Sequence, residues 1–171
     1  GEFDHGLWLG RGTSKLAGMW LSSAFAELSD FRVYHAPLSM ATRRPCKDLS
    51  RVLYFALSES GETEDVVEAA RRGKEHDATC YAIVNDEKSE LMRLADHATC
   101  LDARPNWGYT FLTHMGTLVM AMRLAAAAGG RDVPAGLGEL PDAAARAIAE
   151  NPLIELAEIG METRRAMFLG R

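Results

Sequence analysis

The sequence predicts an α/β fold in which five parallel strands form one sheet with helices on both of its faces. Short apolar runs alternate along the chain with longer segments of helical periodicity, a pattern typical of parallel sheets with right-handed crossover helices. The run at residues 52–57 is apolar throughout, as a strand covered on both faces requires. The chain has 171 residues, of which 47% are hydrophobic, and this is enough for one sizeable core.

The first predicted strand covers residues 6–10, where a short apolar run ends in glycine. A turn follows at residues 11–14, and apolar residues then recur every four positions, which predicts a helix. Thr13 or Ser14 is the expected N-cap of this helix, because a short hydroxyl side chain can accept from the free N–H groups of the first turn. Residues 31–35 form the second predicted strand.

The middle of the chain repeats this pattern. Val52–Leu57 is apolar throughout and is therefore the central predicted strand. A polar turn around Gly61 separates it from a helix over Glu64–Glu75, in which Glu68 and Arg72 are spaced for an i,i+4 ion pair. The next elements are predicted as a strand at Thr79–Val84, a short helix at 89–95 and a fifth strand at 98–101.

The last third of the chain is predicted to be helical. A long helix from Gly108 to about residue 128 is rich in methionine. A flexible connection is expected over residues 129–138, followed by a helical segment over 141–165 with a break near Pro152.

The two ends of the chain resemble each other. Residues 6–11 read GLWLGR and residues 166–171 read AMFLGR, which indicates a repeated unit one domain length apart. The alternative is a C-terminal edge strand of the same sheet. We therefore expect a first domain over residues 1–130, linker helices over 131–165 and the start of a second, similar domain at 166–171.

Composition and charge disfavour several classes of function. The net charge is −5, which argues against a nucleic-acid partner. No run of eighteen apolar residues occurs, so no membrane span is expected. Cys46, Cys80 and Cys100 are odd in number and widely spaced, which indicates reduced thiols in a cytoplasmic protein and neither a disulfide framework nor a metal site.

Two polar turns carry the predicted chemistry. One covers residues 10–14 after the first strand, and the other covers residues 58–63 after the third. Open α/β sheets bind ligands at the carboxyl ends of their strands. Hydroxyl groups, N–H groups freed by glycine and a helix N-terminus together favour phosphate. Helix capping explains either turn singly, but two such turns favour an anion site.

A dinucleotide site is a weaker interpretation of the first turn. Gly10 and Gly12 match half of the glycine fingerprint, but Lys15 stands at the position of the third glycine, and no acidic residue ends the second strand. We therefore expect no cofactor.

The second turn reads SESGETED over residues 58–65 and resembles the S-x-S-G-x-T-x-D signature of the sugar isomerase (SIS) domain family. The first turn, Gly12-Thr13-Ser14, resembles the first G-x-S turn of that family. The likeness covers about residues 6–128 and is strongest with tandem-SIS proteins such as the isomerase part of glucosamine-6-phosphate synthases. It implies a flavodoxin-like, doubly wound SIS fold followed by a second similar domain.

The resemblance also implies a site for a phosphorylated sugar or amino sugar. In the family pattern, hydroxyl groups of both turns hold the sugar phosphate, with help from the backbone of Glu59. The substrate-binding residues that it implies are Gly12, Thr13, Ser14, Ser58, Glu59, Ser60, Gly61 and Thr63.

The chain departs from the synthase pattern at Glu59, where that pattern has glutamine, and at Asn106, Phe111 and Thr113, where it has glutamate, serine and lysine. Because a carboxylate would repel a phosphate dianion, we expect Glu59 to turn away, toward Arg11 or Lys15, and to offer only its backbone N–H. The alternative is that Glu59 binds sugar hydroxyls. The family's catalytic residues lie in the second SIS domain, so no catalytic residue is assigned here.

Two functions remain open on this sequence. The first is half of an aldose–ketose isomerase or a related deaminase or deglycase, in which this domain anchors the phosphate and so positions the reacting carbons. The second is a sugar-phosphate sensor that regulates a partner. His114 shares a helix face with Leu118 and Met122, which favours a structural histidine over a catalytic base.

A homodimer is expected, because the long helix carries more apolar surface than one domain leaves in water. The residues on which this expectation depends are Leu112, Met115, Leu118, Val119, Met120 and Met122.

Overall fold

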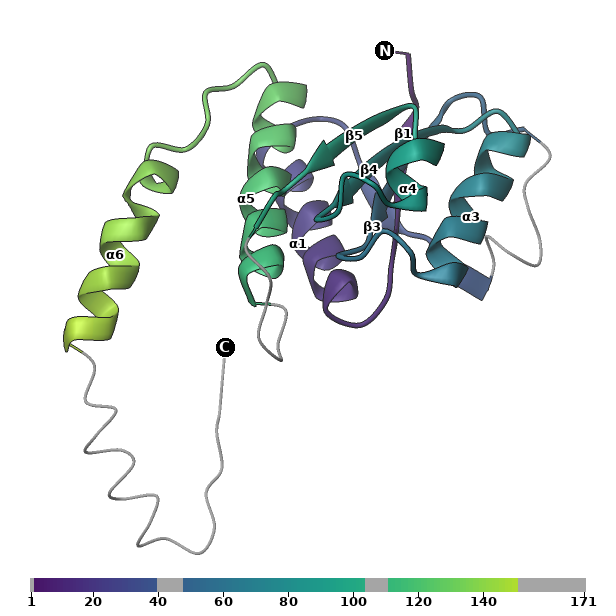
Figure 1. The fold of residues 1–171 in the computed structure, drawn as a ribbon. Coiled ribbons are helices and arrows are strands. Elements are labelled where there is room, and N and C mark those ends of the chain that lie inside the picture. The colour runs from purple at the N-terminus through teal and green to yellow at the C-terminus, as the bar shows by residue number, and fades with distance from the viewer. Residues whose placement is uncertain (1, 40–47, 104–110, 151–171) are drawn as a thin grey trace, which may run out of the picture. The chain divides into compact units, whose positions relative to one another are not determined.

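The structure, a computed structural model, describes residues 2–39, 48–103 and 111–150 (Figure 1). The chain divides into two compact units, Gly1–Pro134 and Ala135–Arg171. The first unit contains the sheet and every described residue of the predicted site. The predicted boundaries at residues 130 and 165 stay predictions, and the predicted start of a second domain lies outside the described residues.

One five-stranded parallel sheet forms the centre of the first unit, with the strand order β2-β1-β3-β4-β5. This confirms the predicted fold class. The strands are β1 His5–Gly10, β2 Val33–His35, β3 Val52–Leu57, β4 Thr79–Val84 and β5 His97–Cys100. Strands β3 and β4 agree with the prediction at both ends, because a mostly apolar run marks a strand that is covered on both faces.

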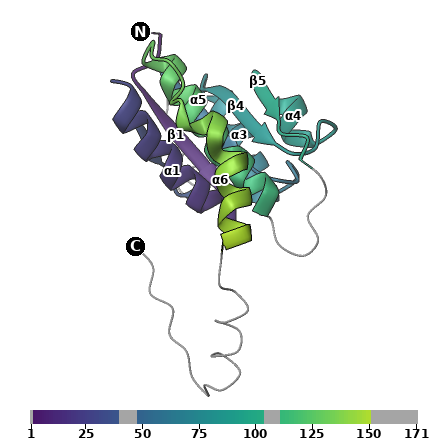
Figure 2. The same cartoon turned by 90° about the vertical axis from the view of Figure 1, so that its left-hand side faces the viewer.

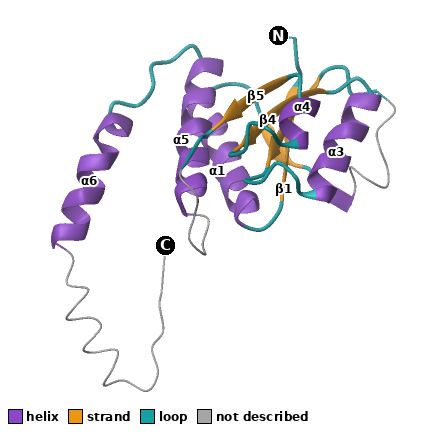
Figure 3. Cartoon of the chain, viewed as in Figure 1, coloured by secondary structure: helices purple, strands orange, loops and turns teal. Residues whose placement is uncertain are grey.

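Helices cover both faces of the sheet (Figure 3). Helices α1, Thr13–Leu28, and α5, Phe111–Ala128, lie side by side on one face (Figures 1 and 2). Helices α3, Glu64–Glu75, and α4, Glu90–Leu94, lie on the other. The predicted pair within α3 is present, since Arg72 Nε lies 2.5 Å from Glu68 Oε1.

The second unit contains α6, Gly136–Glu150. Its start differs from the prediction, because Pro141 lies inside this helix and not at its first residue. Proline is most common in the first turn of a helix, and this preference placed the predicted start several residues too late.

Side chains of alternate strand residues point to opposite faces of the sheet and build two cores. Toward α1 and α5, Trp8, Phe55, Leu57 and Ile83 pack with Phe25. The other core, toward α3 and α4, contains Leu9, Tyr54, Ala56, Val66, Val84 and Leu91. Each large apolar side chain buried in this way contributes about 1.5–3 kcal/mol, so the sheet is a rigid base for the loops at its carboxyl edge.

Helix α1 lies unusually close to β1 because its residue 18 is glycine. A Cβ atom at Gly18 would stand 2.3 Å from the ring of Trp8. The same ring donates a hydrogen bond from Nε1 to Ser22 Oγ over 2.9 Å. These contacts fix α1 along β1, and they therefore fix the first turn of α1 above the end of the strand.

Candidate functional site

The two predicted turns meet at the topological switch point of the sheet. Strands β1 and β3 are neighbours, yet the chain adds β2 on one side and β3 on the other. The loops that leave β1 and β3 therefore diverge to opposite faces and leave a crevice between them, where ligands bind in such sheets. The prediction that both turns open at one strand edge is confirmed.

An open cavity of about 320 Å³ occupies this crevice, and we call it the outer basin. Residues of both turns line it, namely Arg11, Gly12, Thr13, Ser14, Glu59, Ser60 and Thr63. Six of the eight residues implied by the resemblance are among them. The other two, Ser58 and Gly61, belong to the second turn and are buried.

Hydroxyl groups hold the second turn in shape. Ser58 Oγ accepts a hydrogen bond from the Gly61 N–H over 3.1 Å and lies 2.9 Å from Thr63 Oγ1. Ser60 Oγ accepts from the Glu62 N–H over 3.2 Å. Since one hydroxyl proton satisfies the Ser58–Thr63 contact, the second proton of this pair remains available to an acceptor. The turn is thus preorganised by the same groups that the resemblance assigns to the ligand.

Gly61 ties this turn to the start of α4. Its φ of 64° is in the left-handed region, and a Cβ there would stand 2.2 Å from Ser89 Oγ. Ser89 is itself buried and donates from Oγ to the Asp86 carbonyl over 2.7 Å. The Leu91 N–H donates to the Gly61 carbonyl over 3.0 Å. A side chain at position 61 has no space here.

The first turn leads into α1 one residue earlier than predicted. Gly12 is the N-cap, with φ 58° and no side-chain cap hydrogen bond, so the prediction that Thr13 or Ser14 caps the helix was wrong. The left-handed glycine lets the chain enter the helix at once, which places both hydroxyl residues inside the first turn. Thr63, the N-cap of α3, also makes no side-chain cap hydrogen bond. Capping therefore does not explain these hydroxyl groups.

One exposed ion pair bridges the two turns. Arg11 Nη1 lies 2.7 Å from Asp65 Oδ2, so this guanidinium already has one carboxylate partner, and the expectation that Glu59 turns toward Arg11 or Lys15 stays a prediction. Because the Arg11 side chain is 72% exposed and that of Asp65 is 35% exposed, the pair contributes between zero and about 1 kcal/mol. Glu62 is also engaged, because its Oε1 accepts from the Glu90 N–H over 2.7 Å. The backbone carbonyl of Glu59 accepts from the Asn85 N–H over 2.9 Å, which fixes the second turn against the end of β4.

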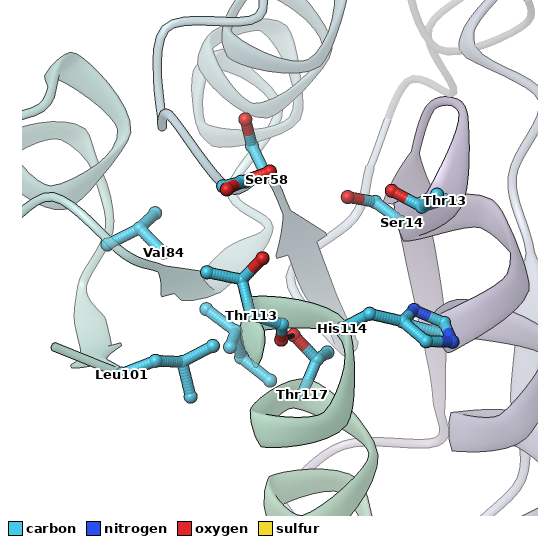
Figure 4. Close-up of a pocket in the computed structure, with 11 residues that line it drawn as sticks. Thr13, Ser14, Ser58, Val84, Leu101, Thr113, His114 and Thr117 are labelled. Carbon is cyan, nitrogen blue, oxygen red and sulfur yellow. Dashed lines mark hydrogen bonds between the residues drawn. The ribbon is translucent and has the colours of Figure 1, made fainter. Parts of the chain in front are cut away.

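A small pocket continues inward from the outer basin, between α1 and α5, and we call it the inner pocket (Figure 4). Its volume is about 20 Å³, the space of about one water molecule. It shares Thr13, Ser14 and Glu59 with the outer basin. The remaining residues that line it are Ala17, Ser58, Ile83, Val84, Leu101, Thr113, His114 and Thr117.

The sequence did not predict Thr113, His114 or Thr117 as site residues. These three polar residues lie on the inward side of a helix that is otherwise mostly apolar, and that spacing is the signal that could have found them. Thr117 Oγ1 donates to the Thr113 carbonyl over 2.8 Å. His114 Nδ1 is buried and has no hydrogen-bond partner among the described residues.

Two further side chains brace the strands behind the site. Asn85 Nδ2 donates to the Ala103 carbonyl over 3.0 Å and Oδ1 accepts from the Ala103 N–H over 2.7 Å, which joins the ends of β4 and β5. Asp96 accepts from the Cys80 N–H over 2.8 Å and from Lys74 Nζ over 2.7 Å.

Burial raises the pKa of the Cys80 thiol to about 12, so this thiol stays protonated and is not a nucleophile.

Within residues 2–39, 48–103 and 111–150, no group of three or more His, Cys, Asp or Glu side chains is placed to hold a metal ion. In the same described ranges, no helix combines the length and apolarity that a membrane crossing requires. The structure does not describe Cys46, Asn106 or the side chain of Phe111.

Comparison with known proteins identifies relatives of this arrangement. The family model for the SIS domain matches residues 4–128. The glutamine–fructose-6-phosphate aminotransferase (isomerizing) of Mycobacterium tuberculosis (strain ATCC 25618 / H37Rv) is 36% identical over 141 residues. This alignment covers 75% of the chain and 22% of the relative, so the chain spans about a fifth of the length of the curated relatives it matches.

Solved structures show the same fold. A Silicibacter pomeroyi protein named "putative phosphosugar isomerase" superposes with a TM-score of 0.72 at 27% identity, over 81% of this chain and 43% of that chain. The Vibrio vulnificus NanR protein complexed with ManNAc-6P superposes with a TM-score of 0.63 at 22% identity, over 74% of this chain and 49% of that chain. The second likeness concerns the fold alone.

Proposed function

Because the chain belongs to the SIS domain family, we propose that its outer basin binds the phosphate of a phosphorylated sugar or amino sugar. The observation that carries this proposal is the convergence of two hydroxyl-rich turns, each at the N-terminus of a helix, on one open cavity. Neither helix begins with a side-chain cap. The first N–H groups of α1 and α3 and the hydroxyl groups beside them are therefore placed for an anion.

Each residue of the basin has a proposed part. Ser14 and Ser60 supply hydroxyl groups from opposite sides of the crevice, and the Ser58–Thr63 pair supplies its remaining proton. A Cβ added at Gly12 would meet no described atom within 4 Å, so the backbone there is open to close approach by a ligand. Hydrogen bonds to a charged acceptor contribute about 1.5–3 kcal/mol each, and several of them together give specific binding.

We further propose that the whole protein is an aldose–ketose isomerase or a related deaminase or deglycase, located in the cytoplasm. The 36% identity to an aminotransferase named as isomerizing supports the reaction class, and the free thiols of Cys80 and Cys100 agree with the location. This domain anchors the phosphate, which positions the reacting carbons for groups elsewhere in the protein.

A sensor of sugar phosphates is the second candidate. One observation favours it, because Thr113 lines the inner pocket at a position where the synthase pattern has lysine. An isomerisation assay of the whole protein with fructose 6-phosphate or glucosamine 6-phosphate separates the two functions, since a sensor binds the sugar without converting it.

Calorimetric titration with glucosamine 6-phosphate tests the binding site. Ser14→Ala should weaken binding at least tenfold, which corresponds to about 1.4 kcal/mol, while thermal stability is unchanged, because the Ser14 side chain lines the two cavities and is not part of the buried core. Ser23→Ala is the matched control, since this exposed serine of α1 lies outside both cavities and donates to the Met19 carbonyl.

Two further arms of this titration test the charge of the ligand. Glu59→Gln should bind the phosphosugar as tightly as the wild type or more tightly, because it removes a negative charge from the basin. Unphosphorylated glucosamine should bind much more weakly than the phosphate. Equal binding of the two sugars would contradict the proposed phosphate site.

A further inference from the structure

The inner pocket contains a polar atom that the described part of the protein does not satisfy. His114 Nδ1 is buried and has no hydrogen-bond partner among the described residues. Buried polar atoms are almost always hydrogen-bonded, because an unpaired one has lost its water without compensation. A buried nitrogen that has no hydrogen-bond partner and lies beside a ligand cavity indicates that its partner is a molecule outside the chain.

The position of His114 places this nitrogen next to the proposed ligand. Its side chain comes from the first turn of α5 and points toward α1, on the side where Thr13 and Ser14 lie (Figure 4). The inner pocket shares Thr13 and Ser14 with the outer basin. A sugar phosphate in the basin therefore has His114 as a neighbour.

The size of the inner pocket limits what can enter it. About 20 Å³ accommodates one oxygen-sized group and excludes a sugar ring. The lining combines the hydroxyl groups of Ser14, Ser58 and Thr113 with apolar side chains such as Ala17 and Leu101. A single oxygen of a ligand bound in the basin fits this space and this polarity.

We propose that His114 is a substrate-binding residue whose Nδ1 makes a hydrogen bond to one oxygen of the bound phosphosugar. The inference rests on the proposed function, and it adds a recognition group from α5 to the two turns. An imidazole nitrogen can donate to a phosphate oxygen, or accept from or donate to a sugar hydroxyl, so the shared chemistry is a ligand oxygen at the mouth of the inner pocket.

Substitution of His114 separates this role from a structural one. His114→Leu removes the unpaired nitrogen, so the free chain should be as stable as the wild type or more stable in thermal unfolding. The affinity for glucosamine 6-phosphate should nevertheless fall at least fivefold. His114→Asn, whose amide lies close to the position of Nδ1, should retain affinity within about twofold of the wild type. His97→Leu, on the exposed edge strand β5, is the matched control and should bind normally.

The outcomes distinguish this inference from the proposed function. Wild-type affinity in His114→Leu would overturn the inference and leave the basin intact, whereas no binding of any phosphosugar by the wild type would overturn both. A parallel titration with inorganic phosphate identifies the oxygen, because an equal loss in His114→Leu assigns the contact to the phosphate and a loss confined to the sugar assigns it to a hydroxyl.

A spectroscopic measurement does not depend on how the variants fold. The ¹⁵N chemical shift of His114 Nδ1 in the wild type should change when glucosamine 6-phosphate is added, and that of His97 should not. An unchanged His114 signal at saturating ligand would overturn the inference.

Discussion

At the scale of single residues, the site depends on two glycines that have similar φ angles, one in open space and one tightly packed. Gly12 and Gly61 have φ values of 58° and 64°. A Cβ at Gly12 would meet no described atom within 4 Å, whereas one at Gly61 would overlap Ser89. The first glycine leaves space for a ligand, and the second lets two loops pack together.

Alanine substitutions should therefore have different effects at these two positions. Gly61→Ala should lower the free energy of unfolding by more than about 2 kcal/mol, because it adds a clash with Ser89 to left-handed strain of about 1–2 kcal/mol. Gly12→Ala should lower the free energy of unfolding only by the backbone strain, because it adds no clash. Its methyl group enters the basin, however, and should weaken phosphosugar binding. Urea unfolding and titration of both variants check this, and equal destabilisation would contradict the steric argument.

At the scale of elements, Asp96 links three of them behind the site. Its carboxylate meets Lys74 of α3 and the Cys80 N–H of β4, and it directly precedes β5. Partial burial raises the pKa of Asp96, but the ion pair with Lys74 and the hydrogen bond from Cys80 outweigh this effect and hold the pKa below its ordinary value of 3.8. The ionised carboxylate thus stabilises the folded state.

Asp96→Asn should lower the free energy of unfolding by about 1 kcal/mol or less at neutral pH, since the carboxylate is more than a third exposed. The sign of the pH dependence follows from the lowered pKa. The contribution is fully present well above pH 3.8 and is lost as the pH falls through the lower pKa of the folded state. The gap between the urea midpoints of the two proteins should therefore narrow as the pH falls from 7 to below 3.8, and a constant gap would refute the assignment.

The elements also show what the sequence could predict. Strands such as Val52–Leu57 were predictable because a buried parallel strand is an unbroken apolar run, and the second turn was predictable because its glycine and hydroxyl pattern is local. The N-cap of α1 was not, because it depends on the left-handed angle of Gly12. The place of His114 was not either, because it follows from the packing of α5 against α1, two helices that are far apart in the sequence.

At the scale of the whole molecule, the described part of the first unit exposes an apolar surface formed by α1 and α5. Leu16, Met19 and Trp20 of α1 and Leu112 and Met115 of α5 are each 45–58% exposed. Of the other residues expected at an interface, Met120 and Met122 pack against the core, and Leu118 and Val119 are half-buried. The exposed surface is therefore shared between the two helices and is not formed by α5 alone.

We propose that a second copy of the chain covers this surface as a homodimer, because exposed apolar patches of this kind mark interfaces. Sedimentation equilibrium of the chain should give the mass of a dimer, and Trp20→Glu should give that of a monomer with unchanged far-UV circular dichroism. Ser23→Glu, a charge on the same helix without loss of an apolar side chain, is the control. A wild-type monomer at high concentration would contradict the proposal.

The strand order β2-β1-β3-β4-β5 has a consequence for how the chain folds during synthesis. Among the five strands, β1 and β2 are synthesised first. Strand β3 then pairs with the free side of β1, and β4 and β5 extend the sheet on that same side. Until β4 arrives, β3 exposes unpaired backbone groups that can recruit other chains. The interval between the synthesis of Leu57 and that of Thr79 is therefore a period in which the nascent chain exposes a strand edge to other chains.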